Sequence, residues 1–219
     1  MDLHSAHAQS TAMTPLVSFD RWSKACAAIG VAPDESDYRR VRRAWRSMGR
    51  HYHTLSHLEA CLRELDAVQA LALRPAEIEL ALWFHDAIYR SWRRDNELQS
   101  AALAVRILHA AAPDIVERIR QMILATTHRE TGFAGDTALL LDIDLTILGS
   151  PPEIYGQFER AVRREYWWVP RARYVAGRGR ILGALLERPA IYQSDRFYEK
   201  FEQPARTNIA AALRQLEWK

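Results

Sequence analysis

The chain has 219 residues, 48% of them hydrophobic, and a formal net charge of +3 at pH 7. This length and apolar content are sufficient for one substantial core, so a single domain is favoured. The small net charge gives no general argument for nucleic-acid binding. The two cysteines, Cys26 and Cys61, form no CxxC pattern, which argues against a disulfide framework and a metal-binding cysteine motif.

The first residues lack the features of a targeting segment. Residues 1–13 are polar and contain no basic stretch followed by an apolar one, which excludes a secretory signal. We expect this segment to be disordered. Nowhere does an apolar run approach the roughly 20 residues of a membrane span. The sequence therefore predicts a cytoplasmic protein without membrane association, in which residues 14–219 form one helical domain.

Prolines mark the starts of the predicted helices, because a proline in the first helical turn loses no needed hydrogen bond. Thr14-Pro15 begins a segment that runs to Gly30, and Arg74-Pro75 begins a helix that ends at His85-Asp86. Further apolar-periodic stretches follow Pro113, Pro151-Pro152, Pro170 and Pro189. Few β-branched alternating runs separate them. The pattern predicts an all-α fold of nine or ten helices.

A cluster of arginines precedes the first histidine-rich motif. Its members are Arg39, Arg40, Arg42, Arg43, Arg46 and Arg50. A charge run of this kind usually forms the solvated face of a helix. Because guanidinium groups favour phosphate, the alternative is a rim that attracts an anionic substrate. The sequence leaves both interpretations open.

Four segments place histidine or aspartate within or beside apolar helical sequence. They are Tyr52-His53-Thr54-Leu55-Ser56-His57, the dipeptide His85-Asp86 after Leu80–Phe84, then Thr127-His128, and finally Leu141-Asp142-Ile143-Asp144. Buried imidazoles and carboxylates are costly unless they are paired or coordinated. Together they suit Mn, Fe, Co, Ni or Zn, or Mg if carboxylates and waters dominate. The sequence therefore predicts a centre for one or two divalent ions.

Asp142 and Asp144 are alternative ligands, because a two-residue step turns a helix by about 200° and both cannot face one site. Asp144 has four leucine or isoleucine side chains at helical offsets of three and four, whereas the neighbours of Asp142 are less bulky. A carboxylate in the more apolar stripe has more need of a cation. We therefore expect Asp144 to be the ligand.

The order His57, then His85-Asp86, then Asp144 resembles the HD superfamily of metal-dependent phosphohydrolases. The wider pattern is similar to a subfamily described only as predicted HD phosphohydrolases; its elements are Tyr52-His53-Thr54-Leu55-x-His57, Trp83-Phe84-His85-Asp86-Ala87-x-Tyr89, Asp95-Asn96-Glu97 and Asp142-x-Asp144-Leu145-x-Ile147-Leu148-Gly149. The resemblance extends from about Asp20 to the C-terminus. It implies an HD-type helical core with additional C-terminal helices. It also implies metal ligation by His57, His85, Asp86 and Asp144.

Several other residues have weaker claims on the site. His53, His128 and Asp142 are candidates for a second metal or for substrate, and Asp86 would then bridge the two ions. His128 is equally explained as a histidine favoured at a helix terminus. Glu97 is a candidate acid or base, although glutamate is common in a first helical turn. Trp167-Trp168 are expected to pack in the core or at the contact of a homodimer.

The resemblance implies hydrolysis of a small phosphorylated substrate, with a nucleotide as the example that the superfamily suggests, through metal-activated water. One alternative is an HD-type di-iron oxygenase, which the extra His53 and His128 favour. A second is a non-catalytic nucleotide-binding sensor, against which the intact and costly ligand set argues. Nucleic-acid binding through the arginine-rich helix is not expected, and it would show a steep salt dependence.

Overall fold

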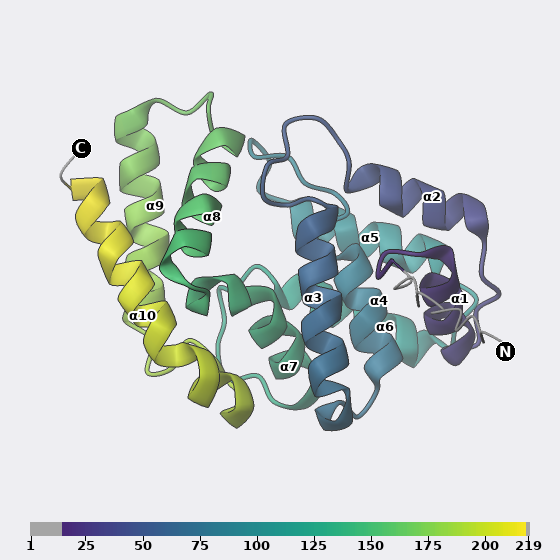
Figure 1. Ribbon diagram of the computed structural model, residues 1–219. Coiled ribbons are helices and arrows are strands. Elements are labelled where there is room, and N and C mark those ends of the chain that lie inside the picture. Colours follow the sequence, from purple (N-terminus) through teal and green to yellow (C-terminus); the bar gives the residue numbers. More distant parts are fainter. Residues whose placement is uncertain (1–14, 218–219) are drawn as a thin grey trace, which may run out of the picture.

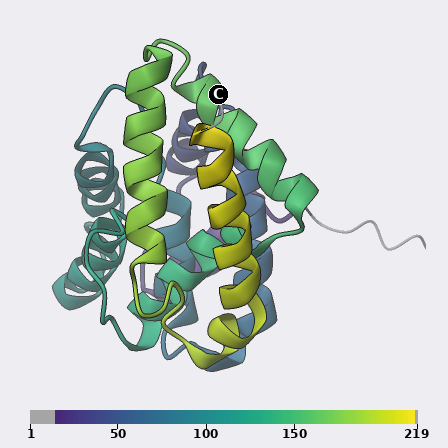
Figure 2. The same ribbon diagram turned by 90° about the vertical axis from the view of Figure 1, so that its left-hand side faces the viewer.

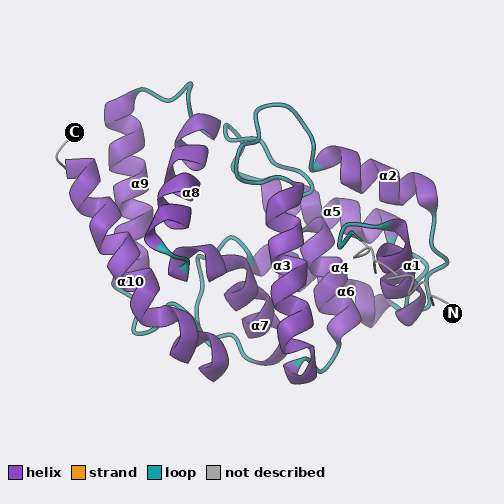
Figure 3. Ribbon diagram, viewed as in Figure 1, coloured by secondary structure: helices purple, strands orange, loops and turns teal. Residues whose placement is uncertain are grey.

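The computed structural model describes residues 15–217, which form ten α-helices, two 3₁₀ helices and no β-strand (Figures 1 and 3). The prediction of an all-α fold is confirmed, whereas the disorder expected for residues 1–13 lies outside the described part. The elements are α1 (Phe19–Ala28), α2 (Glu35–Ala44), α3 (Leu55–Val68), η1 (Gln69–Leu71), α4 (Pro75–Phe84), α5 (Asn96–Ile107), α6 (Pro113–Ala125), α7 (Gly135–Asp144), η2 (Leu145–Gly149), α8 (Pro152–Glu165), α9 (Arg171–Leu186) and α10 (Asp195–Glu217). Between residues 15 and 217, no helix combines the length and apolar character needed to cross a membrane.

Prolines start helices at three of the predicted positions. Pro75, Pro113 and Pro152 occupy the first turns of α4, α6 and α8. The predicted start at Thr14-Pro15 is wrong, because α1 begins only at Phe19. There the side chain of Ser18 accepts a hydrogen bond from the backbone N–H of Arg21 and caps the helix.

Helix α4 is the centre of the core. It contacts α1, α3, α5, α6 and α7, and its residues from Leu80 to Phe84 are fully buried. This run has no polar face, and such a helical segment is stable only when other helices surround it. The rings of Trp83 and Trp22 pack edge-on with their centroids 5.4 Å apart. The backbone carbonyl of Trp83 accepts a 2.9 Å hydrogen bond from the indole N–H of Trp45. This packing places the end of α4, and with it His85, inside the protein.

The C-terminal helices form a second group beside this core. Helix α10 contacts η2 and α9, and Figure 2 shows α9 and α10 lying side by side. Arg178 of α9 pairs with Glu159 of α8 at 2.6 Å. Since η2 directly continues α7, this group packs against the same segment that carries Asp144.

The expectation for Trp167-Trp168 is wrong in part. Both follow the end of α8, and they are 76% and 45% exposed, so neither is a core residue. The indole N–H of Trp168 donates to Ser91 Oγ at 2.9 Å. Both side chains are exposed because they face outward from the turn after α8. The contact of a homodimer stays a prediction.

Gly149 is the closest contact between η2 and α10. A Cβ at this position would lie 2.8 Å from Phe201 Cβ and 2.9 Å from the Phe201 carbonyl oxygen. We expect Gly149→Ala to lower the free energy of unfolding by about 1–3 kcal/mol, because backbone must move to relieve the clash. Urea denaturation followed by circular dichroism measures this change.

Gly177→Ala is the matched control for Gly149→Ala. Gly177 lies within α9, and no atom outside its own helix comes within 4 Å of the added Cβ. The better helix propensity of alanine should stabilise this variant by up to about 1 kcal/mol. Equal stability of the two variants would show that the η2–α10 contact does not require glycine.

Candidate metal centre

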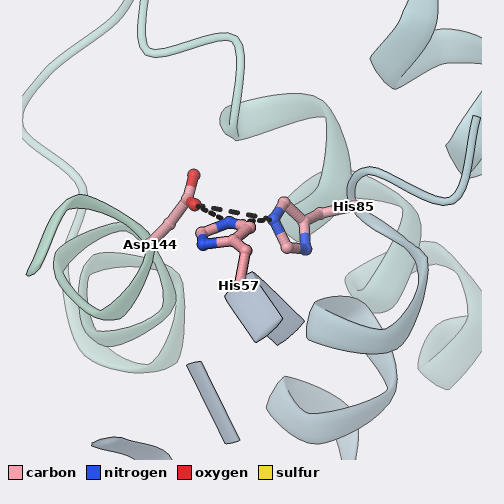
Figure 4. A group of neighbouring side chains, drawn as sticks. All are labelled: His57, His85 and Asp144. Atoms are coloured by element: carbon pink, nitrogen blue, oxygen red, sulfur yellow. Dashed lines mark hydrogen bonds and ion pairs between the residues drawn. The ribbon is translucent and has the colours of Figure 1, made fainter. Parts of the chain in front are cut away.

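Three side chains from three helices converge at one point (Figure 4). His57 lies in the first turn of α3, His85 directly follows α4, and Asp144 ends α7. The Nε2 atoms of His57 and His85 are 3.2 Å apart, and Asp144 Oδ1 lies 3.1 Å from the first and 3.5 Å from the second. Within residues 15–217, this is the one group of at least three histidine, cysteine or acidic side chains whose ligand atoms all lie within 4.8 Å. The cluster could hold a metal ion.

The ring of His85 is fixed in the orientation that a metal ligand needs. Its Nδ1 lies 2.8 Å from the Leu82 carbonyl oxygen. Because a carbonyl only accepts hydrogen bonds, Nδ1 carries a proton, so that in the neutral form of the ring the lone pair of Nε2 faces the cluster. A hydrogen bond of this kind on the far nitrogen is the usual support of a metal-bound histidine.

The charges of the cluster are strongly coupled. Burial lowers the pKa of His57, which favours its neutral, ligating form. Burial also opposes a charge on His85, but the carboxylates of Asp86 and Asp144 raise its pKa to about 9. Burial likewise opposes ionisation of Asp144, yet His85, His128 and His57 hold its pKa well below the usual range. Two imidazoles around an ionised carboxylate suit a divalent transition metal.

Asp86 lies at the edge of the cluster. Its Oδ2 is 3.4 Å from His85 Nε2 and 3.9 Å from His53 Nε2, and its side chain is 14% exposed. It does not belong to the group whose ligand atoms are all within 4.8 Å of one another. The structure thus brings Asp86 beside the three clustered side chains, where it is available as a further ligand.

His128 contacts the second oxygen of Asp144. The distance from His128 Nε2 to Asp144 Oδ2 is 2.8 Å. The backbone of His128 has a left-handed φ of 51°, and its carbonyl accepts a hydrogen bond from Arg188. A non-glycine residue in this conformation is uncommon and is held by its surroundings. His128 therefore orients the Asp144 carboxylate, whose other oxygen faces the two histidines.

His53 is held by Glu165, a residue to which the sequence analysis gave no role. Its Nδ1 lies 2.7 Å from Glu165 Oε2, and its ring stacks on Tyr89 with centroids 4.0 Å apart. Glu165 also accepts three backbone hydrogen bonds, at 2.7, 2.8 and 3.0 Å, from residues 51–53. One buried carboxylate thus fixes the whole approach to α3.

The sequence does contain a signal for Glu165. The buried residues of α8 are Tyr155, Phe158, Val162 and Glu165. Their offsets of three, four and three residues are those of one helix face. An acidic residue that continues an apolar stripe is expected to be buried and to need several hydrogen-bond donors.

Asp142 has a structural position away from the cluster. It is fully buried, and its carboxylate accepts hydrogen bonds from the backbone N–H groups of Gln193 and Ser194 and from the Ser194 hydroxyl, at 2.8, 2.7 and 2.6 Å. It is therefore more buried than Asp144, contrary to the burial argument from the sequence. Hydrogen bonds from residues 193–194, rather than a cation, compensate Asp142.

Glu97 is not brought to the cluster. It lies in the first turn of α5, and no hydrogen bond or ion pair of the described residues joins it to His57, His85, Asp86 or Asp144. The preceding Asp95 bonds to Arg93 and Gln99 instead. The geometry thus gives no support to Glu97 as the acid or base.

A cleft of about 730 Å³ opens onto the cluster at His57. Its walls come from the loop before α3, from α3, η2 and α8, and from the first part of α10. The lining residues are His51, Tyr52, Thr54, Ser56, His57, Ala60, Glu64, Thr146, Ile147, Gly149, Ser150, Pro151, Ile154, Gln157, Phe158, Ala161, Lys200 and Phe201. None of these described residues is an arginine.

The arginine-rich segment therefore does not form the rim of this cleft. Arg50 is buried, and its guanidinium donates to the backbone carbonyls of His53, Asp86 and Ala87 at 2.7–2.9 Å. Arg39 pairs with Glu35 on the exposed face of α2. Arg50 therefore supports the loops around the cluster, and Arg39 belongs to a solvated helix face.

No protein-family model, curated protein or solved structure matches this chain. The case for a metal centre rests on the geometry of the described residues.

The two aspartates of α7 should respond differently to substitution. Asp144→Ala should abolish metal retention after gel filtration, because it removes the carboxylate shared by both histidines. Asp142→Ala should leave bound metal nearly unchanged but lower the free energy of unfolding by about 2–4 kcal/mol, since buried N–H groups lose their acceptor. Elemental analysis and urea denaturation measure the two effects. Equal metal loss in two folded variants would contradict this assignment.

Glu165 should make the stability of the metal-free protein depend on pH. Burial opposes its ionisation, but hydrogen bonds from His53 and from the backbone of His51 and Tyr52 lower its pKa to about 2. Because this folded-state pKa is below the unfolded value of about 4.3, the stabilisation is complete above that value and is lost as the pH falls toward 2. Its size should be about 2–3 kcal/mol.

Glu165→Gln should remove most of that pH dependence and lower stability at pH 6. Urea denaturation of the metal-free protein between pH 6 and pH 3 provides the measurement. Glu153→Gln, at an exposed position of the same helix, is the control and should unfold like the wild type. An equally steep acid loss in Glu165→Gln would assign the effect to other groups.

Proposed function

We propose that this protein is a metal-dependent phosphohydrolase of HD type. The observation that supports the proposal most directly is the convergence of His57, His85 and Asp144 beside a cleft large enough for a small organic phosphate. The same residues, in the same order, carry the resemblance to the HD superfamily. Phosphoester hydrolysis is the activity that this resemblance implies.

The residues of the cluster fit a divalent ion. His57 and His85 would supply nitrogen ligands, Asp144 an oxygen ligand, and Asp86 a further oxygen ligand. A set of three or four protein ligands leaves coordination positions open, as catalytic sites require. Bound there, the ion would lower the pKa of a water molecule and stabilise charge on a phosphoryl oxygen.

The surrounding residues would keep the ligands in place during the reaction. The Leu82 carbonyl fixes the tautomer of His85, and His128 fixes the carboxylate of Asp144. Trp45 packs against the His85 ring with centroids 5.3 Å apart and limits its rotation. Such hydrogen bonds and packing reduce the motion of the ligand side chains from one catalytic cycle to the next.

The di-iron oxygenase is the less supported alternative. The extra histidines that favour it, His53 and His128, are each hydrogen-bonded to a carboxylate, Glu165 and Asp144 respectively. Between residues 15 and 217, no second group of three potential ligands lies within 4.8 Å. The geometry therefore supports the hydrolase more strongly.

The purified protein should retain roughly one or two transition-metal ions per chain. With manganese bound, it should hydrolyse at least one compound in a screen of phosphomonoesters, nucleotides and cyclic dinucleotides. His85→Ala and Asp86→Ala should lose this activity by at least about 100-fold while keeping their helical circular dichroism. A metal-loaded wild type that hydrolyses nothing in the screen would refute the hydrolase.

The paired variant Arg43→Ala/Arg46→Ala provides a control for this experiment. Neither arginine lines the cleft. Metal content and KM should therefore stay within about twofold of the wild-type values. A large rise in KM with unchanged metal content would instead support an arginine rim that attracts the substrate.

A further inference from the structure

The charge of the cleft restricts the substrates that it can accept. Apart from histidine, its charged lining residues are Lys200 and Glu64, whose side chains lie 3.7 Å apart. The Lys200 ammonium also lies 4.3 Å from the centre of the Phe201 ring. The two charges compensate each other, so no surplus cation of the described lining is available to a second or third phosphate.

This charge balance fits a single phosphate group. A phosphomonoester carries between −1.5 and −2 charges at pH 7 and therefore needs less compensating positive charge than a polyphosphate does. Sites that bind polyphosphates add lysines or arginines to the metal to neutralise the remaining charge. The cleft has no such addition.

Part of the lining of the cleft is apolar. Ile154, Phe158 and Ala161 lie on one face of α8, and Ile147 and Phe201 extend the surface onto η2 and α10. Ile154 is 45% exposed although it is a large aliphatic residue. An apolar wall inside a cleft gains stabilisation when a ligand covers it.

We infer that the substrate is a phosphomonoester with a bulky apolar or aromatic body, rather than a polyphosphate. The inference rests on the proposed function. The phosphate would face His57 and its partner ligands, and the organic body would lie against Ile154 and Phe158. Lys200 would stay paired with Glu64 and contribute little to the affinity for phosphate.

Binding of phosphonates, which are not hydrolysed, tests this inference separately from catalysis. Isothermal titration of the manganese-loaded protein should show 1-naphthylphosphonate binding at least about tenfold more tightly than methylphosphonate, since the ring buries apolar surface. ADP should bind no more tightly than AMP. Equal affinities for the two phosphonates, no binding of either, or a tenfold advantage of ADP over AMP would each overturn the inference.

Two matched variants locate the binding surface. Ile154→Asp should reduce the preference for the naphthyl compound over methylphosphonate by at least about fivefold, because both anions meet the added charge but only the naphthyl ring loses the apolar contact. Ile181→Asp, at an exposed isoleucine of α9 that does not line the cleft, should behave like the wild type. An unchanged preference in Ile154→Asp would overturn the inference. Naphthylphosphonate binding without hydrolysis of any phosphoester would refute the hydrolase but support this ligand class.

Discussion

The burial of His85 directly after the apolar run Leu80–Phe84 of α4 is the constraint on which the rest of the structure depends. Helix α4 is surrounded on all sides, so the polar residue that follows it lies inside the protein. A buried imidazole needs a partner for each ring nitrogen. Nδ1 of His85 is hydrogen-bonded to a backbone carbonyl in the preceding turn. Nε2 contacts His57 of α3 and Asp144 of α7, and so links these two helices to the end of α4.

Buried carboxylates hold the loops around this centre. Glu165 accepts backbone N–H groups of residues 51–53, Asp142 those of residues 193–194, and Glu202 those of residues 191–192. In each case one acidic side chain replaces the backbone acceptors that a loop lacks. Acidic residues of this protein therefore have two separate tasks, and burial alone does not distinguish a candidate ligand from a loop anchor.

The sequence predicts the helical class well because helix periodicity and proline positions are local properties. The sequence also identifies the segments of the cluster that could hold a metal ion, since histidine beside apolar sequence is conspicuous. The sequence does not predict contacts between residues that lie far apart in the chain. The anchoring of Asp142 by residues 193–194 and of the His53 segment by Glu165 depends on how α8 and α10 dock. Exposure of Trp167 and Trp168 has the same origin, since no local pattern states which face of a turn is covered.

The bonds from Glu165 have a consequence for the order of folding. They join positions 112–114 residues apart in the chain. Contacts of such separation form late, because a long loop must close before they contribute. During synthesis the first four helices leave the ribosome well before α8 exists. The segment before α3 therefore acquires its final conformation only after α8 has been synthesised, and so does the cluster that it adjoins.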